Sequence, residues 1–486
     1  MSLRKNYFYN LILTIFNILF PILSFPYASR VLGPLGIGKF QFITSFAQYF
    51  ILIASLGIPT YGTREIAKYK GKAEKQSVVF SELLSISFIM SVLLTVIYLV
   101  TVISFNYFSY DKHLYLIASI SILVGFTSID WLYVGLEEFK MIAVRSVIIK
   151  LVSLILLYTL VKSHDDLEMY LYISIFSAVA NNAYNLYTVR KKVKITFSNL
   201  ELRKHTRPLL LIFSLSLAVS MYTLLDVVLL GFLSNARYVG LYSAAVKLTK
   251  IVIPFITSVG TVTMPQISHQ FAEGNLDQVK SVLDKSLHFI LFFAIPSFAG
   301  LILLAPECIV MFSGAKFLEG TISMQILALL PIAIGLGYFW GIQILIPAGK
   351  DKEMVYSVVG GMLIAVTLNF VLVPRLKDVG ASIANVVTEF AVTGFYIYFV
   401  KKNFSFSFGW ATAFKSVAAS LLFVPIILLT RSLNLGVILT LGISVITCGV
   451  TYVSIQWFVF KDHLINDLYV RLLEKFKGKT MVQGLE

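Results

Sequence analysis

The stretch VVFSELLSISFIMSVLLTVIYLVTVI occupies residues 78–103, and its only charged side chain is Glu82. A transmembrane helix needs about 20 consecutive apolar residues, so this stretch is long enough to cross a bilayer. Similar runs recur from Leu11 to Phe460. They predict fourteen membrane-spanning helices, at residues 9–29, 41–61, 78–103, 114–134, 142–161, 167–187, 209–231, 239–264, 286–305, 322–346, 355–374, 379–400, 412–430 and 436–460.

The composition agrees with an integral membrane protein. Hydrophobic residues make up 58% of the 486 residues and charged residues 13%, and the mean hydropathy is +0.84. A soluble chain of this composition would expose far too much apolar surface, so most of the chain must face lipid. The longest predicted loops, residues 191–207 and 266–285, leave no room for a soluble catalytic domain.

Few residues in the chain are typical of cofactor or metal chemistry. Cys308 and Cys448 lie in or beside different predicted helices without a CxxC spacing, and the six histidines are scattered. This pattern indicates neither a disulfide framework nor a metal site. No P-loop pattern is present, so we expect no nucleotide and no other cofactor. The first apolar run is longer than that of a usual signal peptide and has a counterpart in the second half, so we predict a retained helix.

The distribution of lysine and arginine predicts the orientation. With the N-terminus taken as cytoplasmic, 26 of the 40 basic residues fall in the cytoplasmic segments and 9 in the opposite loops. Positive charge gathers on the cytoplasmic side of membrane proteins, so we expect both termini to be cytoplasmic. The basic residues of the cytoplasmic segments also explain the net charge of +15, because they lie beside an anionic leaflet. The charge therefore does not indicate a nucleic-acid-binding domain.

The predicted helices form two similar sets of six, followed by an unmatched pair. Residues 32–40 (LGPLGIGKF) in the first set correspond to residues 230–242 (LGFLSNARYVGLY) in the second. The sixth helix ends YNLYTVRK at 184–191, and the twelfth ends FYIYFVKK at 395–402. Because six is an even number, both sets have the same topology and are related by a pseudo-twofold axis along the membrane normal.

This repeat predicts an all-α transporter with two six-helix lobes that enclose a cavity open alternately to each side. The predicted domains are an N-lobe at 1–191, a C-lobe at 192–402, and helices 13 and 14 with a basic cytoplasmic tail at 403–486.

Ionisable residues inside the predicted spans are the candidate cavity residues, because each buried charge needs a partner or a hydrated wall. The candidate substrate-binding residues are Arg30, Arg64, Arg145, Lys150, Tyr242, Lys247 and Lys250. The candidates for ion coupling or ion pairing are Asp130, Asp226 and Glu389. Further polar candidates for the wall are Tyr27, Asn181, Asn182, Tyr222, Ser243 and Asn385.

Counting from the loop centres places Asp130 level with Arg145 and Asp226 level with Lys247, so each couple is either a structural ion pair or part of the site. The basic surplus remains in either case. Lys150 lies about eight residues, or roughly 12 Å of helix rise, inside its span. Arg30, Arg64 and Lys415 could instead extend from helix ends to the lipid headgroups. A net positive cavity favours an anionic cargo.

Four segments resemble a known family. They are FPYASRVLGPLGIG at 25–38, SLGIPTYGTRE at 55–65, DWLYVGLEEFK at 130–140 and GLYSAAVK at 240–247. The chain resembles bacterial O-antigen and capsule repeat-unit flippases, in the polysaccharide-transporter branch of the multidrug, oligosaccharidyl-lipid and polysaccharide exporter superfamily. The resemblance covers nearly the whole chain.

The resemblance implies a flippase of the bacterial inner membrane that moves an undecaprenyl-pyrophosphate-linked oligosaccharide to the periplasmic leaflet. Its implied partners are the lipid-linked substrate, membrane lipids, a proton or sodium coupling ion, and polysaccharide polymerase and chain-length proteins. In related lipid-linked precursor flippases the last two helices form a groove for the polyprenyl tail, which fits the unmatched pair here.

Two alternatives remain open from the sequence. A multidrug exporter of the same superfamily would favour cationic cargo, against which the basic surplus argues. A membrane polysaccharide polymerase or glycosyltransferase should carry a long extracytoplasmic loop or a paired-acid motif. Asp165 and Asp166, the only adjacent aspartates, lie in a short predicted turn. We therefore predict that the protein is not an enzyme.

Overall fold

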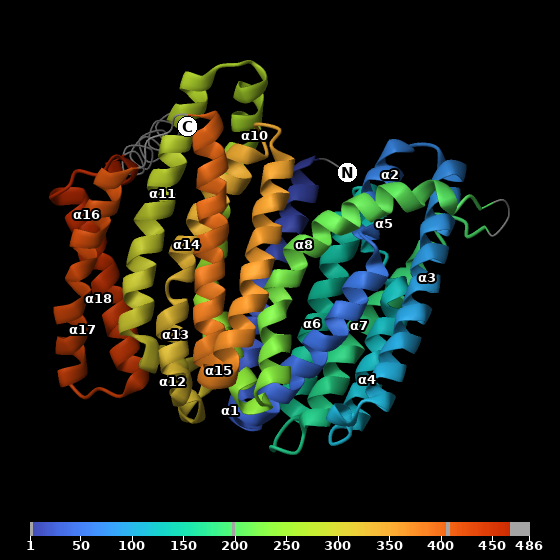
Figure 1. Cartoon of the computed structure of the whole chain (residues 1–486), viewed down its shortest axis with the longest axis horizontal. Coiled ribbons are helices and arrows are strands. Elements are labelled where there is room, and N and C mark those ends of the chain that lie inside the picture. Colours follow the sequence, from blue (N-terminus) through green and yellow to red (C-terminus); the bar gives the residue numbers. More distant parts are fainter. Residues whose placement is uncertain (1–2, 197–199, 405–408, 467–486) are drawn as a thin grey trace, which may run out of the picture. The chain divides into compact units, whose positions relative to one another are not determined.

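The computed structural model describes residues 3–196, 200–404 and 409–466, without some side chains in these ranges, among them that of Tyr222. The described residues form helices and connecting turns, as the sequence predicts (Figure 1). They divide into two compact units. The first comprises Met1–Ser243 with Ala365–Asp378, and the second comprises Ala244–Ile364 with Val379–Glu486. The lobe boundaries after residues 191 and 402 stay predictions.

The first unit holds the N-terminal helices and short 3₁₀ turns. They are α1 (Leu3–Ser55), α2 (Ile58–Lys68), α3 (Ala73–Ser104), η1 (Asn106–Phe108), α4 (Lys112–Leu123), η2 (Val124–Thr127), α5 (Asp130–Gly135), α6 (Phe139–Leu160), α7 (Leu167–Val189), α8 (Arg203–Leu233) and the start of α9 (Ala236–Lys250).

The second unit holds the remaining helices. They are α10 (Ile253–Ala272), α11 (Leu276–Leu303), α12 (Ala305–Ser313), η3 (Ala315–Gly320), α13 (Thr321–Leu327), α14 (Leu330–Gly337), η4, a π-helix (Tyr338–Leu345), most of α15 (Asp351–Asn403), α16 (Trp410–Leu421), α17 (Phe423–Ser432) and α18 (Val437–Phe458).

Two helices are too long for one passage through a bilayer. Both α1 and α15 contain 53 residues, or about 80 Å of helix, against a hydrocarbon core of about 30 Å. Each has one residue with left-handed φ inside it, Gly33 at 69° in α1 and Lys377 at 55° in α15. These kinks fall between predicted spans, because helical dihedrals stop where the sequence turns from one apolar run to the next.

Among the described residues, nine helices are long and apolar enough to span a membrane, or ten if the bent pair α9 and α10 forms one span. In this count α1 is joined to α2 as a single helix, and α15 is also a single helix. The helix α7 is not among them, and Leu224–Leu233 is counted only as a shorter apolar helix. A multi-span membrane protein is therefore shown, and the number fourteen stays a prediction.

The loop that follows α7 is bound to the side of α3. Backbone N–H groups of Lys194 and Thr196 donate to the hydroxyls of Ser77 and Ser81, at 3.0 and 2.9 Å. The residue next to Ser81 is Glu82, the only charge of the predicted span 78–103, which accepts from the Glu201 backbone at 2.9 Å. Polar residues of α3 thus satisfy the backbone of a segment that has no helical partners of its own.

The buried carboxylate of Glu82 has two further partners. Lys204 donates to it at 2.8 Å and His205 contacts it at 2.9 Å, while the other ring nitrogen of His205 contacts the Tyr61 hydroxyl at 2.8 Å. A charge in an apolar helix is tolerated when it is paired and hydrogen-bonded in this way. Glu82 therefore connects α3, α2 and the beginning of α8.

Candidate functional site

The strongest polar cluster of the first unit surrounds Arg145 on α6. Its Nη2 donates to Asp130 Oδ1 at 2.9 Å, its Nε donates to Asn181 Oδ1 at 2.9 Å, and its Nη1 donates to Asn185 Oδ1. Asn185 in turn donates to Asp130 Oδ1 at 2.8 Å. The structure thus joins Asp130 and Arg145 in an ion pair with two amides of α7 as shared partners.

This arrangement withdraws the guanidinium of Arg145 from its surroundings. All three of its nitrogens donate within the cluster, and its side chain is 3% exposed, whereas that of Asp130 is 45% exposed. Tyr133 of α5 holds Asn185 in place, since its hydroxyl donates to the Asn185 carbonyl at 3.0 Å. Buried ion pairs of this kind are stable only when every remaining donor is satisfied. The carboxylate of Asp130 therefore stays accessible, whereas the guanidinium of Arg145 does not.

Within the described residues, Lys150 has an amide partner and no acidic one. Its Nζ donates to Asn17 Oδ1 on α1 and lies 5.9 Å from the centre of the Phe20 ring. On the same pair of helices the Tyr27 hydroxyl donates to the Val161 carbonyl at 2.8 Å. An amide oxygen and an aromatic face stabilise an ammonium without neutralising it. Lys150 thus remains a positive charge between α1 and α6.

The acid of α8 is buried and hydrogen-bonded. Asp226 is 3% exposed and accepts from the Tyr242 hydroxyl and from Asn369 Nδ2, each at 2.9 Å. All three residues belong to the first unit. The predicted partner Lys247 belongs to the second, so its role beside Asp226 stays a prediction. Tyr242, a predicted substrate residue, is itself 1% exposed and orients the carboxylate.

The other predicted site residues are placed separately. Arg30 and Arg64 are exposed, and Arg30 donates to the Pro26 carbonyl at 3.3 Å. Lys247, Lys250 and Glu389 are half-buried in the second unit. Lys415 lies in the middle of α16 and not at the helix end that the sequence suggested, and it donates to the Phe460 carbonyl at 3.5 Å. The side chain of Tyr222 lies outside the described residues.

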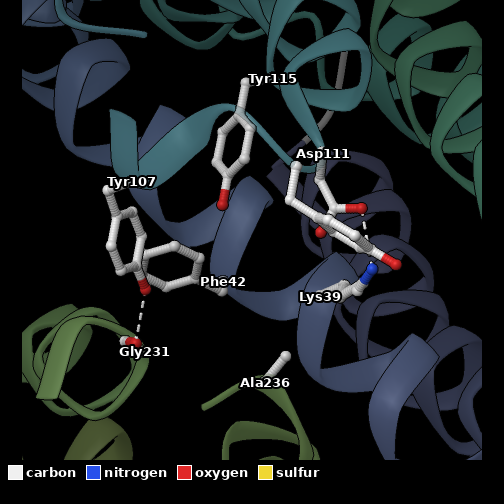
Figure 2. Close-up of a pocket in the computed structure, with 8 residues that line it drawn as sticks. Lys39, Phe42, Tyr107, Asp111, Tyr115, Gly231 and Ala236 are labelled. Atoms are coloured by element: carbon white, nitrogen blue, oxygen red, sulfur yellow. Dashed lines mark hydrogen bonds and ion pairs between the residues drawn. The ribbon is translucent and has the colours of Figure 1, made fainter. Parts of the chain in front are cut away.

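A basic residue that the sequence reasoning did not single out lies in a small aromatic pocket of the first unit. Lys39 donates to Asp111 at 2.8 Å and lies 4.9 Å from the Tyr110 ring centre (Figure 2). Nearby, the Tyr107 hydroxyl donates to the Gly231 carbonyl at 2.7 Å. The pocket has a volume of about 100 Å³, whereas ligand sites usually measure about 300 to 1,000 Å³. We interpret it as a contact that joins α1, η1 and α8.

Within the second unit, the helices α16 to α18 are bound to α11 and α12 by polar contacts near the start of α16 and the end of α17. Arg431 binds Glu307 through two hydrogen bonds of 2.6 and 2.8 Å. His288 contacts Asp462 at 2.9 Å and Thr412 at 2.8 Å. Between these ends the apolar contacts include Phe292, Leu304, Ala419, Phe423, Ile427, Leu441, Cys448 and Tyr452. The terminal helices are therefore packed on the unit and do not stand apart from it.

The side chain of Asp462 lies beyond the last predicted span and is 3% exposed. Burial alone would raise its pKa, but the hydrogen bond and the charge of His288 outweigh burial and hold the pKa of the carboxyl below its usual range. Asp462 is therefore ionised at neutral pH.

Among the described residues, no group of three or more His, Cys, Asp or Glu side chains could hold a metal ion. Apolar helices with short connections, and charged side chains paired inside the bundles, are typical of multi-span membrane proteins that move solutes. The chain is thus a multi-span helical membrane protein of the transporter type. It belongs to the polysaccharide biosynthesis protein family, whose model matches residues 3–271.

The chain is also similar in sequence to known relatives and in fold to solved structures. The chain is 28% identical over 411 residues to a putative O-antigen transporter of Escherichia coli strain K12, covering 83% of this chain and 98% of the relative. Its fold is similar to a lipid II flippase in an inward closed conformation, with a TM-score of 0.73 at 15% identity over 93% of this chain and 99% of that one. It is also similar to an inward-facing multidrug resistance transporter, with a TM-score of 0.62 at 16% identity over 80% and 96%.

Proposed function

We propose that the protein is a flippase that moves an undecaprenyl-pyrophosphate-linked oligosaccharide from the cytoplasmic to the periplasmic leaflet of the bacterial inner membrane, with both termini cytoplasmic. The observation that carries this proposal is the relative named as an O-antigen transporter, which aligns over nearly its whole length. The similarity of fold to a lipid II flippase supports a lipid-linked cargo.

In this proposal basic side chains of the predicted spans attract the pyrophosphate. Lys150 suits this role, because Asn17 and Phe20 hold its ammonium in place and leave its charge uncompensated. Arg30, Arg64, Lys247 and Lys250 are the further candidates. Arg145 acts differently, since it is buried and each of its three nitrogens already donates a hydrogen bond to Asp130, Asn181 or Asn185. We assign it the positioning of Asp130 and the asparagines of α7.

The energy for export has two candidate sources. Moving a negative headgroup outward, down an inside-negative potential, is favourable by about 2.3 kcal/mol per charge per 100 mV. Alternatively, a proton or sodium ion drives the return step through Asp130, Asp226 or Glu389. Alternating access itself is supported by the repeat of six helices, which is typical of transporters with two related halves.

A deletion strain tests the proposal directly. Loss of the protein should cause lipid-linked oligosaccharide to accumulate on the cytoplasmic leaflet and surface glycan to disappear, and the gene in trans should restore both. A multidrug exporter, the second candidate, would instead leave the glycan intact and change the sensitivity to cationic drugs. Normal surface glycan in the deletion strain would contradict the flippase.

A further inference from the structure

A cavity of about 380 Å³ lies inside the first unit, between the second half of α1, the α4 to α5 segment and α7. Its wall combines small apolar side chains with hydroxyl and amide groups. The lining residues are Thr44, Ala47, Gln48, Ile51, Ala118, Ser121, Gly125, Ser128, Asp130, Leu171, Ser174, Ile175, Ala178, Asn181 and Asn182. Its volume falls within the range of about 300 to 1,000 Å³ usual for small-ligand sites.

The polar groups of this wall have hydrogen-bonding capacity to spare. In the part of the chain that the structure describes, the side chains of Gln48, Ser121, Ser128 and Ser174 make no hydrogen bond. Asn182 uses its amide nitrogen on the Val124 carbonyl at 3.3 Å, which leaves its oxygen available. Unpaired donors and acceptors inside a membrane protein are costly unless water or a ligand satisfies them.

The charge of the cavity excludes an anion. Among the described residues that line the cavity, Asp130 is the ionisable one. Its hydrogen bonds with Arg145 and Asn185 both use Oδ1. Its Oδ2 thus remains an acceptor. The matching cation, Arg145, is buried and already paired with Asp130, so its charge does not offset a second negative charge in the cavity. A phosphate here would meet a carboxylate and no free base.

The cavity continues toward a second one. A space of about 240 Å³ shares Gln48, Ile51, Gly125 and Ser128 with the first. Its other polar lining residues include Ser55, Ser87 and Ser91. The Trp131 ring also lines it. Together they form a slot of alternating hydroxyl and apolar surface, which matches the hydroxyl edges and C–H faces of a sugar.

We propose that this cavity binds an uncharged sugar residue of the cargo, separately from the cations that bind the pyrophosphate. The inference rests on the proposed function and adds to it a specificity site within the N-terminal unit. Gln48 and the serines exchange hydrogen bonds with sugar hydroxyls, and Asp130 Oδ2 and Asn182 Oδ1 accept from them. Arg145 is a positioning residue that holds the Asp130 side chain in place through its ion pair with Oδ1.

A substitution that fills the cavity with a large side chain tests the proposal in cells. Ala178→Phe places a ring in the cavity, whereas Ala183→Phe adds the same ring to the same helix at an exposed position outside the lining. At equal membrane abundance, Ala178→Phe should abolish surface glycan and Ala183→Phe should preserve it. Equal glycan from the two variants would overturn the proposal.

Protection of an introduced cysteine tests the site without transport. Ser174→Cys, in a chain with Cys308 and Cys448 replaced by alanine, is labelled with a maleimide in the full-length purified protein. The probes are the lipid-linked glycan that accumulates in the deletion strain and undecaprenyl pyrophosphate without sugar. At ten times its Kd, the glycan lipid should slow labelling about tenfold, and the sugar-free lipid should not.

Direct binding of both lipids to the same protein separates the possible failures. Binding of the glycan lipid without protection, or equal protection by the sugar-free lipid, would overturn the sugar site and leave the flippase intact. Absence of binding by the glycan lipid would overturn the flippase proposal itself.

Discussion

Gly38 and Gly240 lie in contact, so closely that a Cβ on Gly38 would come within 2.8 Å of the Gly240 backbone nitrogen. The same Cβ would lie 1.5 Å from the Ala236 carbonyl oxygen, and a Cβ on Gly240 would lie 2.0 Å from that of Pro34. These glycines occupy corresponding positions in the two halves of the sequence repeat. Only glycine permits the backbones of α1 and α9 to approach this far.

We expect Gly38→Ala and Gly240→Ala to lower the melting temperature of the purified protein. Overpacking of this kind costs about 1 to 3 kcal/mol, and here the opposing atoms are backbone atoms that cannot rotate away. Gly442→Ala on α18 is the matched control, because a Cβ there meets no atom within 4 Å. A Gly38→Ala protein as stable as that control would contradict the contact.

The Arg145 cluster predicts a coupled pair. Arg145→Gln should destabilise the protein by about 1 to 3 kcal/mol, because Asp130 loses its counter-ion while remaining partly solvated. Arg145→Lys should not restore full stability, since one ammonium cannot reach three acceptors at once. Thermal melts of the single variants and of Asp130→Asn with Arg145→Gln form a double-mutant cycle. Strict additivity would show that the two side chains do not interact.

Charge reversal tests the cations proposed for the pyrophosphate. Lys150→Glu and Lys247→Glu should each abolish surface glycan in a deletion strain while the protein remains in the membrane. Glutamate at either position repels a pyrophosphate instead of attracting it. Lys162→Glu, at an exposed position between α6 and α7, serves as the control. Wild-type amounts of surface glycan from both Lys150→Glu and Lys247→Glu would refute the role of these lysines.

The contact between His288 and Asp462 predicts a pH-dependent attachment of the terminal helices. Asp462→Asn should destabilise the protein by about 1.5 to 3 kcal/mol at neutral pH. Because the folded pKa of Asp462 is lowered, its contribution is present above the ordinary aspartate pKa of about 3.9 and is lost as the pH falls through the folded value. The difference in stability between the wild type and Asp462→Asn, measured by melting curves, should therefore persist at pH 5 and disappear below about pH 4. A difference independent of pH down to 3 would argue against the carboxylate.

Truncation after Lys402 tests the role of α16 to α18. The shortened chain should still insert, because the earlier apolar spans and their loop charges are unchanged. It should lose export of a long-tailed lipid, since a tail groove contributes roughly 0.8 kcal/mol per buried methylene, while a short-chain analogue should lose much less. Reconstituted vesicles measure both lipids. Arg431 and Phe423 also pack on α11 and α12, so Arg431→Gln in the full chain is the control for stability. Equal loss of export for the two lipids would show that these helices serve assembly and not tail binding.

The sequence predicts the class of fold and the family well. Apolar runs such as residues 78–103 have no stable place except a helix in lipid, because only a helix satisfies its own backbone there. The segment FPYASRVLGPLGIG at 25–38 is specific enough for the family resemblance, and the family model confirms it. The pairing of Asp130 with Arg145 could also be anticipated, since both lie at similar distances from one loop.

What only the tertiary structure decides is which polar groups are already satisfied. The sequence reasoning lists both Arg145 and Lys150 as candidate substrate residues. In the part of the chain that the structure describes, Arg145 is bound by Asp130, Asn181 and Asn185, whereas Lys150 contacts the Asn17 amide and the Phe20 ring. Likewise, Glu82 is a lone acid in an apolar run until His205 and Lys204 fold back onto it. Apolar periodicity is a local property of the chain, whereas the hydrogen-bond partners of these charges come from other helices, from 15 residues away for Asp130 and Arg145 to 133 for Asn17 and Lys150. The free energy of a buried charge depends on those partners.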